Sequence, residues 1–474
     1  MYSSVKKKRG ADRPFGIRDK LGYLFGDFGN DFTFILSSSF LLKFYTDVMG
    51  VEAYVVGIVM MIARFADAVT DITMGRLCDK MHPTSAGKFK PWILRMCAPV
   101  AIASFLIYQS TLADAAMGFK IVWLSVTYIL WGSVFYTSIN IPYGSMASAI
   151  SEDPHDRQSL STFRTMGGTL AGVIIGGGIP LIVYKKVILG TNTVTILDGG
   201  RFTVVAGILS LLAIGAYLLC YFLTTERVKF DTQSKSAQSR GVVDLIKSAV
   251  TNRALISIIF ASVFMLLSQL TMQGMANYIY PNYYNNATAM SVATLGMMGG
   301  MLISAAVAKP LARFLGKAEI SAISNGFAAV VCFAIFLLRP QSVWVYIALQ
   351  FLAWLGLGLF SMVSWALITD VIDYSEIKNG VREDGSIYAI YSFARKLGQA
   401  AASGLGGALL TIVGYSEASA FDRSVLEGVF NISTLLPAIG FAALAAILAF
   451  WYPLKKGVVN RNVAFLKAKR EREI

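Results

Sequence analysis

Charged side chains are scarce in this chain of 474 residues. They make up 15% of it, whereas apolar side chains make up 55%. A soluble globular domain carries roughly 25% charged residues, so this composition argues against an ordinary soluble protein. A bilayer core contains no water to satisfy backbone polar groups, and a helix satisfies these groups internally. The scarcity of charge therefore predicts an all-α membrane protein.

Cysteine and histidine are also few. The four cysteines are scattered without a CxxC pair, which argues against a disulfide framework or a metal site. His82 and His155 lie in segments expected to be loops, so proton transfer would have to use carboxylates. No glycine-rich loop ends in Gly-Lys-Ser/Thr after a strand, so ATP is not implied and we expect no cofactor.

Long apolar runs are what the sequence has in place of charge. Crossing a bilayer takes about 20 mostly apolar residues per helix. Twelve runs qualify, at 21–50, 53–77, 91–112, 119–150, 160–184, 202–223, 255–280, 289–315, 320–338, 343–372, 386–414 and 430–451. The chain before the first run is basic and that run is too long for a signal peptide, so we expect no cleavable signal.

Lysine and arginine concentrate before the first run, after the second, between the sixth and seventh, and after the last. With an even number of runs these segments share one side, which the positive-inside rule makes cytoplasmic. We therefore expect both termini inside a bacterial inner membrane. The net charge of +14 is then mostly a topology signal, and no motif in the basic tails indicates nucleic-acid binding.

The longest polar segment divides the runs six and six. Residues 224–254 contain a Gln-Ser-Lys-Ser-Ala-Gln-Ser-Arg stretch that is typical of a flexible linker. We predict two six-helix bundles, 1–223 and 255–474, with a basic cytoplasmic tail on the second. Transporters are often built from two such repeats, with the substrate bound near the membrane midplane.

Two carboxylates lie within the second run, where the membrane interior makes them costly. Asp67 and Asp71 are four residues apart and Arg64 precedes them by one turn, so the three share a helix face. A carboxylate in hydrocarbon costs about 2.5–3.5 kcal/mol, so this face must meet protein or water. Two interpretations stay open, a site for a small cation or an ion-pair cluster that only holds helices together.

Two later runs carry stripes of polar side chains spaced four residues apart. They are Gln269, Gln273 and Asn277 in the seventh run, and Tyr388, Ser392 and Lys396 in the eleventh. Hydroxyl, amide and ammonium groups can serve the many donors and acceptors of a sugar, although hydrogen bonding between helices would use the same pattern. In the first run, Asp27 either contacts substrate or pairs with a nearby cation.

Charges of both signs occupy the loops on the predicted cytoplasmic side. Those expected to form ion pairs across the two halves are Arg76, Asp79, Asp370, Asp373 and Glu376. Exposed pairs are worth only about 0–1 kcal/mol each, so a gate needs several acting together. A solvated charged loop is the alternative interpretation.

Several short segments occur in an order and spacing typical of one transporter family. They are 26–32 (GDFGNDF), 45–48 (YTDV), 63–75, 87–92 (GKFKPW), 128–132 (YILWG), 140–143 (NIPY) and 370–378 (DVIDYSEIK). Over residues 22–414 the chain resembles the glycoside–pentoside–hexuronide:cation symporters of the major facilitator superfamily. The resemblance implies twelve transmembrane helices in two bundles and symport of a sugar or glycoside with a cation by alternating access, not enzymatic activity.

The resemblance also implies a cation site. Asp67, Asp71 and Thr137 fall on cation-ligand positions of the family. Thr70 stands where an asparagine is usual, and its hydroxyl reaches less far than an amide oxygen. The short reach of Thr70 argues against a sodium site, and two carboxylates on one face tend to share a proton. The coupling ion is therefore expected to be either H+ or Na+.

A sugar site is implied in the same way, with Asp31, Arg164 and Lys396 on matching polar positions. The full set of expected substrate contacts is Asp27, Asp31, Asn140, Tyr143, Arg164, Gln273, Asn277, Tyr388, Ser392 and Lys396. Asn140 stands where the family has an aspartate, and Gly144 and Ser361 stand where it has tryptophans. The basic residues Arg164 and Lys396 are retained while an acidic position carries Asn140. This balance of charge is compatible with an anionic sugar such as a hexuronide.

Other functions stay open at this stage. A passive sugar uniporter would share the fold, as would a lysolipid-type cation symporter of the same superfamily or a membrane sensor. We expect a monomer whose partners are the sugar or glycoside, the coupling cation and membrane lipid.

Overall fold

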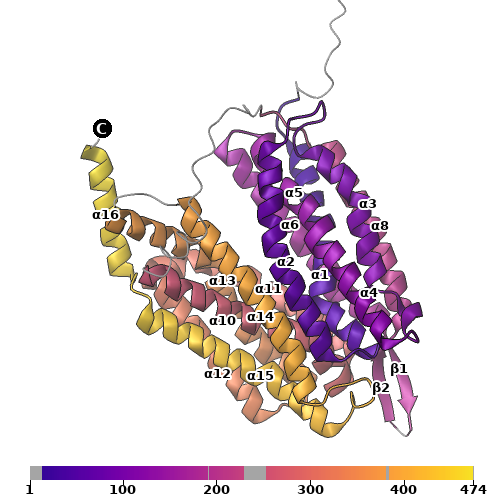
Figure 1. Cartoon of the computed structure of the whole chain (residues 1–474). Helices are drawn as coiled ribbons and strands as arrows, with labels where there is room; N and C mark the ends of the chain where they lie inside the picture. Colours follow the sequence, from indigo (N-terminus) through magenta and orange to yellow (C-terminus); the bar gives the residue numbers. More distant parts are fainter. Residues whose placement is uncertain (1–12, 191, 229–251, 380–383, 473–474) are drawn as a thin grey trace, which may run out of the picture. The chain divides into compact units, whose positions relative to one another are not determined.

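The structure is a computed structural model that describes residues 13–190, 192–228, 252–379 and 384–472. Within these ranges the chain is almost wholly helical apart from one short hairpin of strands, β1 (Tyr184–Leu189) and β2 (Asn192–Leu197) (Figure 1). Most of the expected linker, residues 229–251, lies outside the described residues. The domain boundaries expected there stay predictions.

Nine helical segments in the described part of the chain are long and apolar enough to cross a membrane, judged by length and composition. They are Lys90–Ile107, Met117–Ile150, His155–Val183, Gly199–Leu223, Arg253–Tyr283, Ala287–Leu315, Lys317–Leu338, Val343–Lys378 and Arg423–Trp451. The helices α1 (Ile17–Asp47), α2 (Ala53–Lys80) and α14 (Asp384–Ile412) are also long, at 31, 28 and 29 residues. They carry ionisable side chains of the candidate site, which lower their apolar character. The count of twelve spans stays a prediction.

Packing divides the chain into two compact units. Unit 1 comprises Met1–Val51, Ala63–Val183 and Leu197–Ser236, and unit 2 comprises Glu52–Ile62, Tyr184–Ile196 and Ala237–Ile474. The first turns of α2 and nearly all of the hairpin therefore group with unit 2, although the chain reaches them from unit 1. Each unit is described by itself.

In unit 1, α1 packs against α6 and α8, and α3 packs against α5 and α8. Two segments of π-helix, η2 and η3, interrupt the long spans. Besides α1 and α2, the elements are α3 (Lys90–Ile107), η1 (Ser110–Leu112), α4 (Met117–Ile129), η2 (Leu130–Tyr136), α5 (Thr137–Ile150), α6 (Pro154–Gly172), η3 (Val173–Gly178), α7 (Ile179–Val183) and α8 (Gly199–Leu223).

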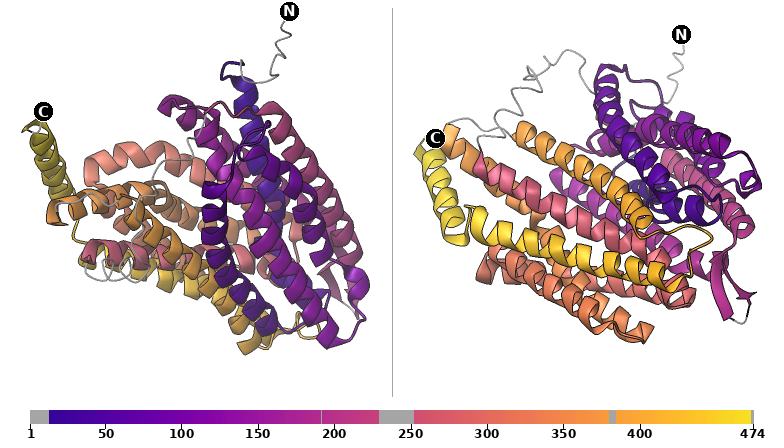
Figure 2. Two further views of the ribbon diagram at one scale, coloured as in Figure 1. Left: turned by 45° about the horizontal axis from the view of Figure 1, so that its top comes forward. Right: turned by 60° about the horizontal axis from the view of Figure 1, so that its bottom comes forward.

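In unit 2, α12 packs against α13 and α15, and α10 runs beside α15 (Figure 2). Besides α14, its helices are α10 (Arg253–Tyr278), η4 (Ile279–Tyr283), α11 (Ala287–Leu315), α12 (Lys317–Leu338), α13 (Val343–Asn379), α15 (Arg423–Ala446), η5 (Ile447–Trp451) and α16 (Lys456–Arg472). The last of these, α16, is rich in lysine and arginine and corresponds to the basic tail expected from the sequence.

A half-buried carboxylate fixes the chain that follows α8 to the start of α3. Glu226 accepts backbone N–H bonds from Lys88 at 2.6 Å, Phe89 at 2.9 Å and Lys90 at 2.7 Å. Burial raises the pKa of the Glu226 carboxyl above its ordinary value, while the three N–H donors favour the charged form and oppose that shift. The loop between α2 and α3 is thus held against the end of α8.

Close backbone contact between α1 and α6 depends on Gly167. A Cβ at this position would collide with the carbonyl oxygen of Leu24, whereas a Cβ at Gly178, in the same span, would meet no atom within 4 Å. Overpacking typically costs about 1–3 kcal/mol. Gly167→Ala should therefore lower the melting temperature of the purified protein, and the matched control Gly178→Ala should not. Equal melting temperatures for the two variants would contradict the packing of α1 on α6.

Candidate functional site

The candidate cation residues meet beside a π-helical segment. η2 lies in line with α4 and α5, so the chain from Met117 to Ile150 forms one span with a wide turn in its middle. Gly132 and Ser133 lie in η2, and Thr137 begins α5. π-turns inside helices recur at functional sites, because the wide turn redirects side chains and frees backbone carbonyls.

Two hydroxyls of this span reach the two carboxylates of α2. Ser133 Oγ donates to Asp67 Oδ1 at 2.6 Å, and Thr137 Oγ1 donates to Asp71 Oδ1 at 2.8 Å. The two contacts join residues with the same sequence offset of 66, so α2 and this span run in the same direction here. The result is a ladder of two carboxylate–hydroxyl pairs, one helical turn apart.

Asp67 has a second partner of opposite charge. Arg64 Nη1 lies 3.3 Å from Asp67 Oδ2, and the Arg64 guanidinium sits over the Phe34 ring at 5.0 Å. A Cβ at Gly132 would lie 3.3 Å from Asp67 Oδ1, so a glycine there leaves room for the carboxylate. A cation that binds Asp67 must therefore compete with Arg64.

Thr70 uses its hydroxyl within its own helix. The hydroxyl donates to the backbone carbonyl of Ala66 at 3.1 Å or of Asp67 at 3.2 Å. The structure thus brings Asp67, Asp71 and Thr137 together as the sequence predicts, while the Thr70 hydroxyl bonds the α2 backbone. Sequence reasoning missed Ser133, which precedes Thr137 by one turn. The matching spacing of four in both helices is the signal that could have found it.

A second polar group forms where α1 faces α6. Arg164 Nε donates to Asp27 Oδ1 at 2.9 Å. The Arg164 guanidinium also lies over the Tyr143 ring, 5.3 Å from its centroid, and Tyr143 stacks on Tyr23 at 4.6 Å. Of the two interpretations left open for Asp27, the structure shows the ion pair. The pair is unequally covered, because the Arg164 side chain is 40% exposed and the Asp27 side chain only 13%.

Asp31 shares this group through Gly168, which follows Arg164 by one turn. A Cβ at Gly168 would lie 2.5 Å from Asp31 Oδ2 and 3.0 Å from Asp27 Oδ2. Both carboxylates therefore point at the same stretch of the α6 backbone, close to each other. Gly168 has a role beyond helix packing, because any side chain there would displace the carboxylates.

Asn140 belongs to a hydrogen-bond network that the sequence did not reveal. Asn30 Nδ2 lies 3.4 Å from Asn140 Oδ1, and Tyr217 in α8 donates to Asn30 Oδ1 at 2.8 Å. Asn30 and Tyr217 are fully buried. This network ties α1, at the residue next to Asp31, to α5 and α8.

The candidate substrate residues of unit 2 lie on α10 and α14. Asn277 is fully buried and accepts a hydrogen bond from Tyr184 of the hairpin at 3.3 Å, and the Gln273 amide lies 4.0 Å from the Met297 sulfur. Ser392 and Lys396 are half-buried on α14.

An aromatic surface joins α13 and α14; its Tyr388 is an expected substrate contact, whereas its Trp365 was missed. Tyr388 is 53% exposed and stacks on Trp365 of α13 with 5.0 Å between ring centroids. Trp365 is itself 42% exposed and lies one turn beyond Ser361, the position where the family has a tryptophan. The Arg395 guanidinium lies 5.7 Å from the Trp365 ring. Helical spacing from Ser361 is the signal that could have identified Trp365.

Of the expected gate residues, Asp370 has a partner inside unit 2. Its Oδ1 lies 2.5 Å from the Lys317 ammonium. Asp373 and Glu376 are half-buried on the same helix, and Arg76 is exposed on α2. The side chain of Asp79 lies outside the described residues. A gate between the two halves stays a prediction.

Comparison with known proteins places this geometry in a family. Residues 22–456 match the family described as MFS/sugar transport protein. The chain belongs to this family. It is 28% identical over 446 residues to the uncharacterized symporter YjmB of Bacillus subtilis (strain 168), covering 94% of each chain. It is also 28% identical over 439 residues to the glucuronide carrier protein homolog of Escherichia coli (strain K12), covering 92% of each.

A solved structure shares the fold. The crystal structure of a D-xylose-proton symporter superposes with a TM-score of 0.62 at 14% identity, covering 93% of this chain and 98% of that one. The expected resemblance and the major facilitator fold are therefore confirmed. The protein is a multi-pass membrane transporter for a small sugar-type molecule and not an enzyme.

Proposed function

We propose that the protein carries a sugar or glycoside across the membrane together with a proton, by alternating access. Asp67 and Asp71 are the proton-binding groups in this proposal. The observation that carries it is the ladder in which Ser133 and Thr137 each donate to one carboxylate. We also propose that it resides in a bacterial inner membrane with both termini in the cytoplasm, from the lysine and arginine distribution.

The ladder suits a proton better than a sodium ion. A hard cation needs a cage of several oxygen ligands, whereas a proton needs only one carboxylate and a neighbour that can accept a hydrogen bond. A hydroxyl can reverse its role and accept from a protonated carboxyl, which Ser133 and Thr137 can both do. Thr70, which stands at an amide position of the family, turns its hydroxyl to its own backbone.

The coupling ion is tested with the purified protein in vesicles. An imposed pH gradient should drive sugar uptake in the absence of sodium, and a protonophore should abolish it. Thr70→Asn should add a sodium-stimulated component, because the amide oxygen reaches farther. Thr73→Asn is the matched control, since the Thr73 hydroxyl makes the same backbone bond on an exposed face. Uptake that requires sodium and ignores the protonophore would contradict proton coupling.

The substrate we propose is an anionic sugar of the hexuronide class. A guanidinium has five N–H donors, and the described contact of Arg164 with Asp27 uses only the one on Nε. The remaining donors suit a planar carboxylate, which binds arginine in a two-pronged manner. Support comes from the similarity to a protein named as a glucuronide carrier homolog.

A panel of labelled glycosides and their matching uronides, offered to vesicles in pairs, tests the substrate class. Faster uptake of the uronide member in each pair supports the proposal. A preference for the neutral members would contradict it and leave sugar symport in place.

A further inference from the structure

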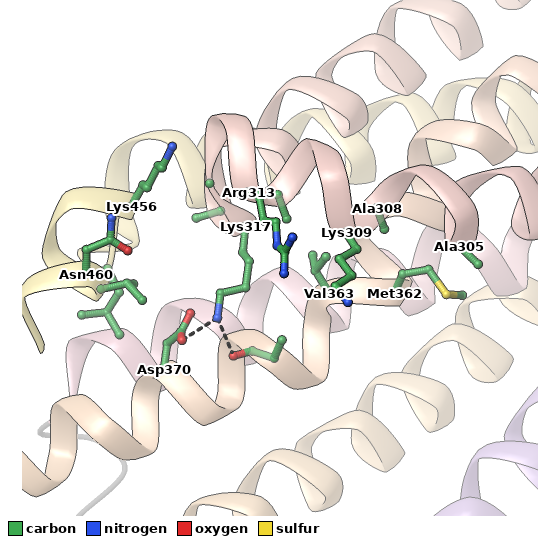
Figure 3. A pocket seen from close by; sticks show the side chains of 16 residues that line it. Ala305, Ala308, Lys309, Arg313, Lys317, Met362, Val363, Asp370, Lys456 and Asn460 are labelled. Carbon is green, nitrogen blue, oxygen red and sulfur yellow. Dashed lines mark hydrogen bonds and ion pairs between the residues drawn. The ribbon is translucent and has the colours of Figure 1, made fainter. Parts of the chain in front are cut away.

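A cavity of about 660 Å³ lies at the lysine-rich end of unit 2, and none of its lining residues is assigned to the sugar or the proton (Figure 3). It is lined by the end of α11, the start of α12, the middle of α13 and the start of α16. Its charged lining residues are Lys309, Arg313, Lys317, Lys456 and Asp370. Four cations thus surround one carboxylate.

The cations come from three helix ends. Lys309 and Arg313 are four residues apart on α11 and share a face, Lys317 opens α12 and Lys456 opens α16. Lys317 pairs with Asp370, which leaves the other three charges uncompensated by any carboxylate in the lining. Lys309 and Arg313 are exposed, and no hydrogen bond or ion pair fixes them within the described residues.

A second carboxylate, that of Glu319, lies next to the cavity and offsets part of this excess. Glu319 Oε1 accepts the backbone N–H of Lys456 at 2.8 Å and so caps the start of α16. The Lys456 ammonium donates to the carbonyl of Phe314 at 2.7 Å. The anion-binding capacity of the cavity therefore rests on the side chains of Lys309 and Arg313, because those of Lys317 and Lys456 already have partners.

The other end of the cavity is apolar. It is lined by Ala305, Ala308, Met362 and Val363. α11 also carries exposed apolar side chains outside the cavity, with Leu302 67% exposed and Phe314 78% exposed. A ligand with a negative head and a hydrocarbon body would match both ends, whereas a free phosphate would use only one.

We propose that this cavity binds the phosphate headgroup of an anionic phospholipid, with Lys309 and Arg313 as the principal contacts. Basic pockets between helices at the cytoplasmic face of membrane proteins bind such headgroups, and arginine matches phosphate geometry. A volume of about 660 Å³ falls in the range of roughly 300–1,000 Å³ seen for small-molecule sites, so it accommodates a glycerophosphate while the acyl chains stay in the bilayer.

Native mass spectrometry of the purified full chain, titrated with phosphatidylglycerol or phosphatidylcholine, tests the proposal. The wild-type protein should bind phosphatidylglycerol more tightly. One basic residue near an anionic lipid is worth about fivefold in binding, so Lys309→Gln/Arg313→Gln should weaken it about 25-fold. Arg461→Gln/Lys467→Gln on α16 removes the same charge outside the cavity and should leave the affinity unchanged.

A second experiment asks whether the phosphate group bound in the cavity belongs to a lipid or to a soluble ligand. Inorganic phosphate replaces the lipid, and the melting temperature of the protein is measured. Stabilisation by inorganic phosphate that disappears in the cavity variant, without tighter binding of phosphatidylglycerol, would assign a soluble ligand and overturn the lipid proposal. Equal binding of the two lipids, or equal loss in the cavity and control variants, would also overturn it. If the double variant does not fold, Lys309→Gln and Arg313→Gln are tested singly, each with an expected fivefold loss.

Discussion

Asp67→Asn and Asp71→Asn are each expected to abolish uphill accumulation of the sugar. Each carboxylate is paired with one hydroxyl donor, so an amide of nearly equal size keeps the shape of the site. A side-chain amide does not take up and release a proton near neutral pH, whereas a carboxylate can. Coupling between the ion and the sugar therefore disappears. Accumulation against a gradient in energised vesicles measures this effect.

The same variants should still exchange sugar down its own gradient, because the alternating motion does not need the coupling site to be charged. Exchange of labelled for unlabelled sugar thus separates lost coupling from a misfolded protein. Asp114→Asn, at an exposed loop position, is the control and should accumulate sugar normally. Wild-type accumulation in both α2 variants would show that the ladder only holds the helices together.

The sequence predicts the carboxylates of this ladder but not its geometry. The helical spacing of Asp67 and Asp71 is visible in the sequence, and so is the cost of burying them in hydrocarbon. Ser133 escaped because serine is common in membrane helices and its hydroxyl often bonds the backbone of its own helix. Only the spacing of four that it shares with Thr137, matching that of Asp67 and Asp71, distinguishes it in the sequence.

Long-range partners escaped for a different reason. The sequence shows that Asn277 belongs to a polar stripe in an otherwise apolar helix. It does not show that the Tyr184 hydroxyl of the hairpin would donate a hydrogen bond to it. The hairpin was itself missed, because hydropathy marks only the apolar runs on either side of it, at 160–184 and 202–223. Its content of valine, isoleucine and threonine and the turn at Gly190 are the β signals present in the sequence.

Arg164→Ala is expected to reduce sugar affinity at least about tenfold, and Lys396→Ala is predicted to do the same. Arg164 pairs with Asp27, so its removal leaves a largely covered carboxylate beside a second one, Asp31. The loss of the guanidinium also removes the donors proposed to bind the sugar, and a hydrogen bond to a charged group is worth about 1.5–3 kcal/mol. A tenfold loss of affinity corresponds to about 1.4 kcal/mol, so one such bond is enough.

Two matched variants on α6 isolate the cause. Arg164→Lys keeps the charge but loses the planar guanidinium. Relative to Arg164→Ala, it should therefore restore binding of a neutral glycoside better than binding of a uronide. Arg157→Ala removes an exposed arginine two turns earlier on the same helix and should leave affinity unchanged. Equilibrium binding of a uronide and its neutral counterpart to each purified variant is the measurement.

Arg164→Ala should weaken uronide binding more than neutral binding, because a carboxylate loses its counter-charge as well as hydrogen bonds. Near-normal binding of both sugars would mean that Arg164 and Asp27 form a structural pair and that the sugar binds elsewhere.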